Sequence, residues 1–236
     1  MQQRSTKFIK FINKDKEFQS EKLFLGVDLG GEDRKTTGIC LLKKDGDLNF
    51  FNCKACKVIF GRDFFKEIGP HLSKIKVIAI DAPLTSGKGK GKMRLFEKFL
   101  STRIFREEKI NPLPPALMPS LCDFAKKIKK ILEKKGFILN LNLIETFPTF
   151  IEKVASRKFF ILNPPCQNKH QRSAFICALL AFFHFERKAR FLGYKDGLLF
   201  LPEFSLWKKD FKKKFTLAWK ERPRLKYRYL STNIYF

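Results

Sequence analysis

Acidic residues are scarce in this chain. Its 236 residues include 23 Asp and Glu against 49 Lys and Arg, which leaves a formal net charge of +26 at pH 7. An excess of this size creates a strong positive field and predicts an anionic partner, with nucleic acid, DNA or RNA, as the first candidate. Two weaker explanations stay open: a lysine-rich composition can reflect codon bias, and a cationic surface can also bind anionic lipid.

Long apolar runs are missing as well. The longest, at 173–185, is shorter than the roughly 20 residues that a membrane-spanning helix needs. Residues 1–22 are charged throughout and lack the apolar region of a signal peptide. The 6 cysteines are scattered along the chain, which favours free thiols in a reducing compartment. These absences predict a soluble cytoplasmic protein without a membrane partner, and no protein partner can be inferred.

Several catalytic motifs are also absent, including the Gly-x-Ser-x-Gly elbow and the dinucleotide fingerprint. The glycine- and lysine-rich loop at 85–94 superficially resembles a phosphate-binding loop. Its glycine spacing is wrong, however, and Met93 stands where Ser or Thr would bind magnesium. A flexible clamp for a nucleic-acid backbone explains the loop better, with a merely solvated lysine loop as the alternative. The predicted contacts are Lys88, Lys90, Lys92 and Arg94.

Three apolar segments each run into an acidic residue. Such short, β-branched runs are typical of strands that are covered on both faces. Proline follows two of these acids closely, and because it cannot continue a central strand, the chain must turn out of the sheet there. An acid on a rigid strand end is well placed for chemistry, although capping of a turn is the simpler explanation for any one of them. The segments and their acids are 23–27 with Asp28, 76–80 with Asp81, and 137–144 with Glu145.

The order of the expected elements indicates an α/β fold. Three strands in a meander are followed by a helix, a fourth strand, helices, a fifth strand and a helix from about 170 to 190. This order builds the ribonuclease H-like fold, a mixed five-stranded sheet flanked by helices, in which the first and fourth strands are adjacent. Asp28 and Asp81 would then be neighbours. The expected strands are 23–28, 36–42, 48–58, 76–81 and 137–145, with a terminal edge strand at about 195–202.

The chain divides by character into a lead-in segment at 1–22, the ribonuclease H-like domain at 23–203 and a basic aromatic extension at 204–236. Aromatic residues in the extension are spaced four apart, which places them on one face of a helix. Docking of this face on the core is favoured over stacking on bases, since aromatic stripes are usually core. These residues are Trp207, Phe211, Phe215 and Trp219.

Carboxylates that converge on one point repel each other unless a cation lies between them, and oxygen ligands suit Mg²⁺ or Mn²⁺. Two such ions can activate a water and stabilise the leaving oxygen of a phosphodiester. Asp28, Asp81 and Glu145 are therefore the predicted metal ligands and catalytic acids. His170 could act as a base or orient a water.

The motifs resemble a family of predicted nucleases, catalogued as a domain of unknown function, whose hallmark is an Ile-Asp-Ala-Pro-Leu segment, here residues 80–84. The resemblance covers about residues 23–202 and implies a ribonuclease H-like fold and nuclease activity. Arg34 and Lys35, within one of the matching motifs, are further predicted nucleic-acid contacts. The other matching segments are 26–31, 34–38, Arg94 with Glu97 and Leu100, 114–115, 145–148, His170 with Ala174, Cys177 and Ala178, and 197–202.

One position departs from the family pattern. The last helix usually begins with a sequence like His-Asp-x-Asp-Ala, whereas residues 170–174 here read His-Gln-Arg-Ser-Ala. Ser173 replaces an aspartate that would be a metal ligand, so a catalytically inactive nucleic-acid-binding protein is the alternative. A sugar-kinase or actin-like ATPase is suggested by residues 26–31 but disfavoured, because those proteins need two such domains.

The cysteines give a weaker metal hypothesis. Cys53-x-x-Cys56 is half of a zinc pattern, and Cys166-x-x-x-His170 could supply the rest. Because the spacing between the halves fits no recognised zinc finger, buried thiols are the favoured interpretation.

Overall fold

A computed structural model describes residues 21–45, 50–86, 93–161 and 166–234. The lead-in at 1–20 lies outside these residues, and so do Lys88, Lys90 and Lys92 of the lysine-rich loop.

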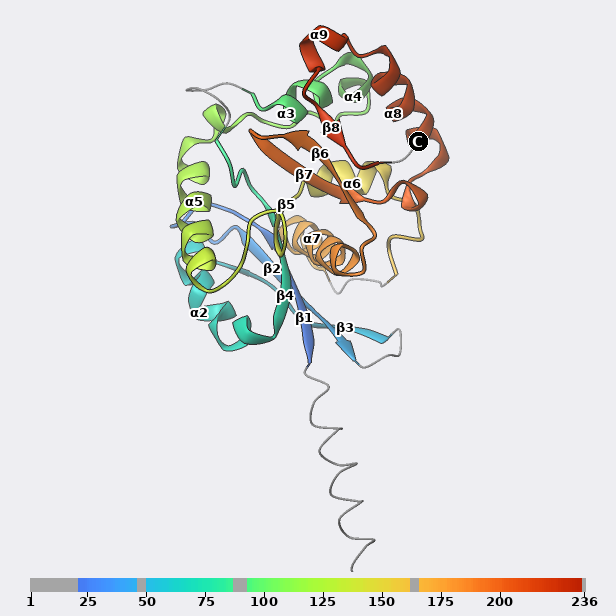
Figure 1. The fold of residues 1–236 in the computed structure, drawn as a ribbon. Coiled ribbons are helices and arrows are strands. Elements are labelled where there is room, and N and C mark those ends of the chain that lie inside the picture. The colour runs from blue at the N-terminus through green and yellow to red at the C-terminus, as the bar shows by residue number, and fades with distance from the viewer. Residues whose placement is uncertain (1–20, 46–49, 87–92, 162–165, 235–236) are drawn as a thin grey trace, which may run out of the picture.

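A mixed five-stranded sheet forms the centre of the protein (Figure 1). Its order is β3-β2-β1-β4-β5, with antiparallel pairing among the first three strands and parallel pairing of β1 with β4 and of β4 with β5. The predicted meander, the α/β class and the mixed five-stranded sheet flanked by helices are confirmed. The strands are β1 (Lys22–Asp28), β2 (Thr37–Asp45), β3 (Phe50–Ile59), β4 (Ile75–Asp81) and β5 (Leu143–Glu145).

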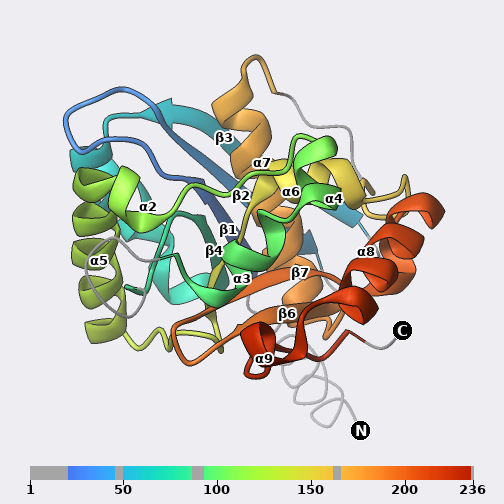
Figure 2. The same ribbon diagram turned by 90° about the horizontal axis from the view of Figure 1, so that it is seen from above.

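Each face of the sheet is covered by its own layer (Figures 1 and 2). One face packs against α2 (Phe64–Ile68) and α5 (Pro119–Lys134), and the other against α7 (Lys169–Phe185). Side chains of β1 alternate between the layers, as the two-residue period of a strand requires: Phe24 faces α7, and Leu25 faces α5. The α7 layer also contains the short helices α3 (Leu95–Leu100), α4 (Arg103–Glu107) and α6 (Pro148–Val154).

Helix α7 is apolar on almost every side and almost wholly buried. Glycines let it lie directly on the sheet. A Cβ atom added to Gly26 would stand 2.0 Å from the carbonyl oxygen of Ala174, and one added to Gly38 would stand 2.2 Å from that of His170. The close approach fixes the first turns of α7 over the ends of β1 and β2.

A second, three-stranded sheet follows α7, with the order β7-β6-β8. The expected helix to residue 190 ends instead at Phe185, because Arg187 adopts a left-handed backbone with φ 60° and the chain then enters β6 (Ala189–Tyr194). The predicted edge strand at 195–202 is β7 (Gly197–Pro202), which pairs along its length with β6. A single parallel bridge between Phe200 and Thr146 connects β7 to the main sheet just after β5. The third strand of this sheet is β8 (Ser231–Thr232), near the C-terminus, which pairs with the other edge of β6.

Three residues of the aromatic stripe, Phe211, Phe215 and Trp219, lie in α8 (Lys209–Glu221), whereas Trp207 precedes the helix in extended backbone. All four pack on the core, as predicted. Phe215 is completely buried and lies against the rings of Phe99, Phe105 and Trp207. A four-residue helix, α9 (Arg224–Tyr227), follows. In the described part of the chain, no helix combines the length and the apolar character that crossing a membrane requires.

Three other expectations need correction in detail. The helix expected between the third and fourth strands is a short α2 between 3₁₀ turns at Gly61–Asp63 and Gly69–Lys74. The first helical segment after the fourth strand is divided into α3 and α4. The strand expected from 137 begins only at Leu143, because a turn around Asn140, with φ 66°, precedes it.

Replacement of Gly26 by Ala should destabilise the protein by about 3 kcal/mol or more, since the new methyl group would collide with the backbone of α7. The matched control is Gly69→Ala, at an exposed helical position with no atom within 4 Å of the added Cβ, where the change should stay within about 1 kcal/mol. Chemical denaturation measures both. Equal midpoints for the two variants would contradict the close packing of α7.

Candidate functional site

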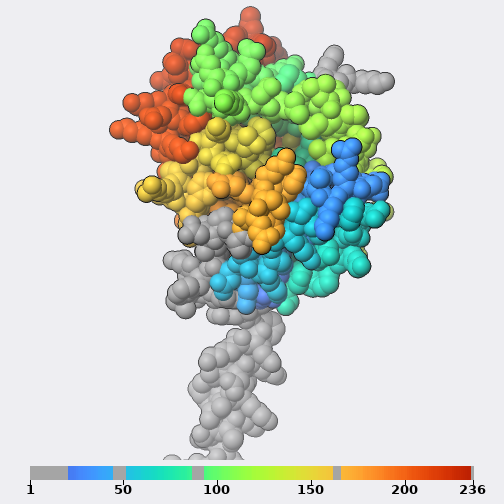
Figure 3. Space-filling model, turned by 180° about the vertical axis from the view of Figure 1, so that it is seen from behind, coloured from blue at the N-terminus to red at the C-terminus, as the bar shows by residue number. Residues whose placement is uncertain are grey.

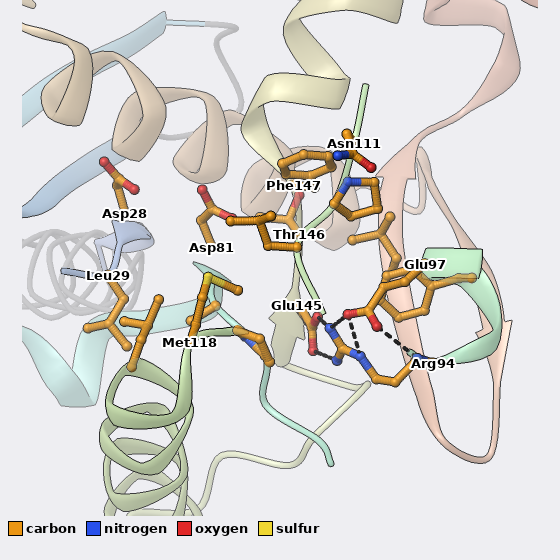
Figure 4. A pocket seen from close by; sticks show the side chains of 17 residues that line it. Asp28, Leu29, Asp81, Arg94, Glu97, Asn111, Met118, Glu145, Thr146 and Phe147 are labelled. Carbon is orange, nitrogen blue, oxygen red and sulfur yellow. Dashed lines mark hydrogen bonds and ion pairs between the residues drawn. The ribbon is translucent and has the colours of Figure 1, made fainter. Parts of the chain in front are cut away.

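Asp28 and Asp81 end two neighbouring parallel strands in the same register position. Alternation along each strand decides where they point. Phe24 of β1 and Ala79 of β4 face the α7 layer, and the acids lie an even number of residues beyond them. Both carboxylates therefore lie on the α7 side, at the carboxyl end of the sheet (Figure 4).

His170 joins this pair from the second position of α7. Its Nδ1 lies 2.8 Å from Oδ2 of Asp28. The contact follows from the packing of α7, because the backbone of His170 lies on Gly38, the cross-strand neighbour of Asp28. Asn168 caps the helix by accepting a hydrogen bond from the Gln171 backbone, which fixes this first turn. Figure 3 shows the start of α7 (orange) beside the turn after β1 (blue).

Both aspartates are harder to ionise than an ordinary carboxyl group. Burial, together with the negative charges of Asp28 and Glu145, raises the pKa of Asp81 well above its usual value. Burial also raises the pKa of Asp28, and the hydrogen bond from His170 opposes this only in part. A cation between the two carboxylates would relieve both effects.

Glu145 takes a different position from the one expected. It pairs with Ile80 instead of Asp81, and Ile80 faces the α5 layer, so the carboxylate of Glu145 leaves the sheet on the opposite side. There its two oxygens each lie 2.7 Å from a guanidinium nitrogen of Arg94. Oε2 also accepts a hydrogen bond of 2.9 Å from the backbone of Leu84.

Arg94 likewise differs from the expected surface contact. Its side chain is only 2% exposed, and the guanidinium also bonds Glu97 at 2.9 Å through Nε (Figure 4). Glu97 in turn accepts a hydrogen bond of 2.7 Å from the Arg94 backbone. One cation thus forms ion pairs with two buried carboxylates, which the sequence did not indicate beyond the three-residue spacing of Arg94 and Glu97.

The three acids therefore do not converge on a single point. Among the described residues, the only group of three metal-binding side chains whose ligand atoms all lie within 4.8 Å consists of cysteines. Cys53 and Cys56 meet Cys40 there, and Cys166 lies next to Cys56. His170, which the half-pattern included, lies with Asp28 instead.

A cavity of about 290 Å³ opens beside the two aspartates. Asp28, Asp81 and Glu145 stand along it, and much of the remaining wall is apolar (Figure 4). The apolar wall includes Leu29, Phe96, Pro112, Met118 and Phe147. An arrangement of a few charged groups in a largely apolar hollow is typical of binding sites for organic ligands.

A second, basic hollow lies beside the chain that follows Asp81. Residues 84–86, which continue directly from the chain after Asp81, form one side, and lysines of α5 form the other. These are Lys126, Lys129 and Lys130. Arg34 and Lys35 are exposed in the turn between β1 and β2, and Ser173 lies half-buried one turn after His170 in α7.

Comparisons with protein-family models, with curated proteins and with solved structures found no match to this chain. The resemblance to the predicted nucleases stays a prediction.

Replacement of Arg94 by Met should destabilise the protein by roughly 3–5 kcal/mol, because Glu97 and Glu145 would be buried without a partner. The control is Arg103→Met, which removes the exposed pair with Glu107 and should change stability little. Denaturation midpoints at pH 7 measure both. A mild effect of Arg94→Met would show that its carboxylate partners are better solvated than this geometry indicates.

Asp81→Asn should stabilise the protein at neutral pH in the absence of divalent metal. The folded-state pKa of Asp81 is raised, so the folded state binds the proton more tightly than the unfolded state does. Stability of the original protein should therefore fall as the pH rises from about 4, the ordinary range of Asp, towards the raised value. The gain from Asp81→Asn should vanish below this window. Unfolding free energies between pH 3 and pH 8 test this, and a gain independent of pH would contradict it.

Proposed function

We propose that this protein is a metal-dependent nuclease that hydrolyses phosphodiester bonds of nucleic acid. The observation that carries the proposal is the pair Asp28 and Asp81, which are adjacent at the carboxyl ends of two central parallel strands and share one side with His170. The strand order β3-β2-β1-β4-β5 supports a ribonuclease H-like fold, in which acids at these two strand ends are adjacent.

The two aspartates suit Mg²⁺ or Mn²⁺. Magnesium is commonly bound by one or two carboxylates, with water and substrate phosphate completing its ligands. Asp28 and Asp81 provide this number of carboxylates. Burial raises the pKa of both groups, and for Asp81 the negative charges of Asp28 and Glu145 add to the rise. Bound metal would stabilise negative charge on the phosphate and make water a better nucleophile.

Glu145 is no longer part of this ligand set, because Arg94 neutralises it. Its role is positioning. By accepting a hydrogen bond from Leu84, it holds the chain that leaves the sheet three residues after Asp81. This contact would hold Asp81 in position beside Asp28.

His170 is placed for proton transfer. Its Nδ1 contacts Asp28, which orients the ring and leaves Nε2 as the nitrogen that could take a proton from an attacking water.

The basic hollow supports nucleic acid as the substrate. Three lysines of α5 stand across from residues 84–86, in the chain that follows Asp81, where they could bind phosphates of a nucleic-acid strand. Arg34 and Lys35 would extend this contact from the turn between β1 and β2. The net charge of +26 would attract the polyanion from a distance.

A catalytically inactive nucleic-acid-binding protein is the second candidate. Two observations favour it: Ser173 stands in α7 where the resemblance implies an aspartate, and Arg94 engages Glu145. Only two carboxylates then remain for metal. Binding would still depend on the lysines, so the two candidates differ in cleavage and not in affinity.

The deciding experiment is cleavage of labelled single- and double-stranded DNA and RNA with Mg²⁺, with Mn²⁺ and with chelator. Metal-dependent cleavage is expected, and Asp81→Asn should lower its rate by a factor of at least about 100, since it removes one of two metal-binding carboxylates. Nucleic-acid affinity should be equal or higher, because a negative charge is lost. The control is Asp210→Asn, at an exposed position of α8, which should cleave normally.

Salt-sensitive binding without cleavage would instead support the inactive protein, and Ser173→Asp should then restore metal-dependent activity. Replacement of Lys129 and Lys130 by Gln tests the basic hollow against Lys213 and Lys220 of α8, which carry the same charge elsewhere. Greater loss of affinity in the first pair is expected. Equal losses would show that net charge, and not the hollow, determines binding.

A further inference from the structure

Four cysteines gather on the α7 side of the β2–β3 hairpin. Cys40 Sγ lies 3.8 Å from Cys53 Sγ, and Cys56 Sγ lies 3.9 Å from Cys166 Sγ. The sulfurs of Cys40, Cys53 and Cys56 all lie within 4.8 Å of one another. All four are free thiols, and they come from β2, from β3 and from the segment before α7.

A β-bulge brings two of them to the same face. Residues three apart in a regular strand point to opposite sides, so Cys53 and Cys56 would normally be separated by the sheet. In β3, however, the register shifts between the pairs Leu41 with Ala55 and Leu42 with Cys53, which leaves Lys54 as an extra residue. Cys53 and Cys56 then face the same layer as Cys40, whose cross-strand partner is Cys56.

We propose that this cluster binds a zinc ion, with Cys40, Cys53, Cys56 and Cys166 as ligands. Tetrahedral zinc holds thiolates at about 2.3 Å, which separates neighbouring sulfurs by about 3.8 Å. The Cys40–Cys53 and Cys56–Cys166 sulfur distances, 3.8 Å and 3.9 Å, are close to this value. Soft thiolate ligands select zinc over Mg²⁺ or Mn²⁺, so this site is chemically distinct from the aspartates.

Cys166 completes the set by a short movement. It contacts Cys56 but belongs to a different segment from the hairpin thiols, so it can close on an ion already held by the other three. Gln171 forms an outer layer around the site: its side-chain nitrogen donates to the carbonyl of Cys56 at 3.1 Å, and its side-chain oxygen accepts from the backbone of Gln167 at 2.7 Å. Buried outer contacts of this kind orient metal ligands.

Zinc here would be structural. It would fasten the β2–β3 hairpin to the segment that leads into α7, and thereby hold the first turn of α7, where Gln171 follows His170. All four ligand positions would come from the protein, which leaves no open position for catalysis. Binding would release the thiol protons, including the one by which Cys56 contacts the carbonyl of Gln171 at 3.5 Å.

The test is metal content and stability of the full chain, purified under reducing conditions and reconstituted with ZnCl₂. Roughly one zinc per chain is expected, with a rise in melting temperature that chelator reverses. Cys53→Ser and Cys56→Ser should lower zinc affinity at least 100-fold, and Cys166→Ser at least 10-fold. Cys122→Ser, at a cysteine in α5 outside the cluster, should bind zinc normally.

Cobalt provides a readout independent of folding changes in the variants. Co²⁺ added to the original protein should give the intense visible bands of tetrahedral coordination and a thiolate charge-transfer band in the near ultraviolet. No metal bound after reconstitution, with six reactive thiols, would overturn the proposal. So would disulfides joining Cys40 to Cys53 or Cys56 to Cys166 in the reduced preparation. Unchanged affinity in Cys166→Ser would overturn its assignment as the fourth ligand. None of these results depends on nuclease activity.

Discussion

The close packing of α7 on the sheet is the constraint on which the rest of this structure depends. Gly26 and Gly38 remove the side chains that would otherwise stand between helix and strands, so the backbone of α7 touches that of β1 and β2. Because a close-packed interior is hardly compressible, a shift of the strands would move the helix with them. The height and rotation of α7 therefore decide where its first turn stands, and with it the distance between His170 and Asp28.

A second constraint acts on the acids themselves. Burial raises the pKa of Asp81 well above its usual value, and the negative charges of Asp28 and Glu145 add to this rise. The protein resolves part of the conflict internally, because Arg94 compensates Glu145 and Glu97. Asp28 and Asp81 keep their mutual repulsion. The uncompensated charge at the aspartates, next to an ion-paired arginine, is the feature on which the proposed metal site depends.

The sequence predicted the sheet well because its strands are short, apolar and closed by acids and prolines. Asp28 and Asp81 could be predicted to be neighbours, because a ribonuclease H-like strand order places the first and fourth strands side by side. Glu145 looked equivalent in sequence, but its direction depends on register, and a shift of one residue moves a side chain to the other face. The residues of one strand do not reveal its register with a strand that is distant in sequence. Arg94 was misplaced for a related reason: a charged residue after a lysine-rich loop looks exposed, and only the tertiary fold surrounds it with acids.

The two metal hypotheses meet at the first turn of α7. His170 contacts the acid side at Asp28, while the next residue, Gln171, contacts the thiol side at Cys56. If both proposals hold, hard oxygen ligands would select Mg²⁺ at one site and soft sulfur ligands would select Zn²⁺ at the other. The bulge at Lys54 that assembles the thiols costs β3 its regular pairing, and bulges of this kind commonly re-aim side chains beside active sites. An ion at the thiols would then stabilise the first turn of α7, which positions His170 beside Asp28. It would do so through the contact between Gln171 and Cys56, without adding charge at the aspartates.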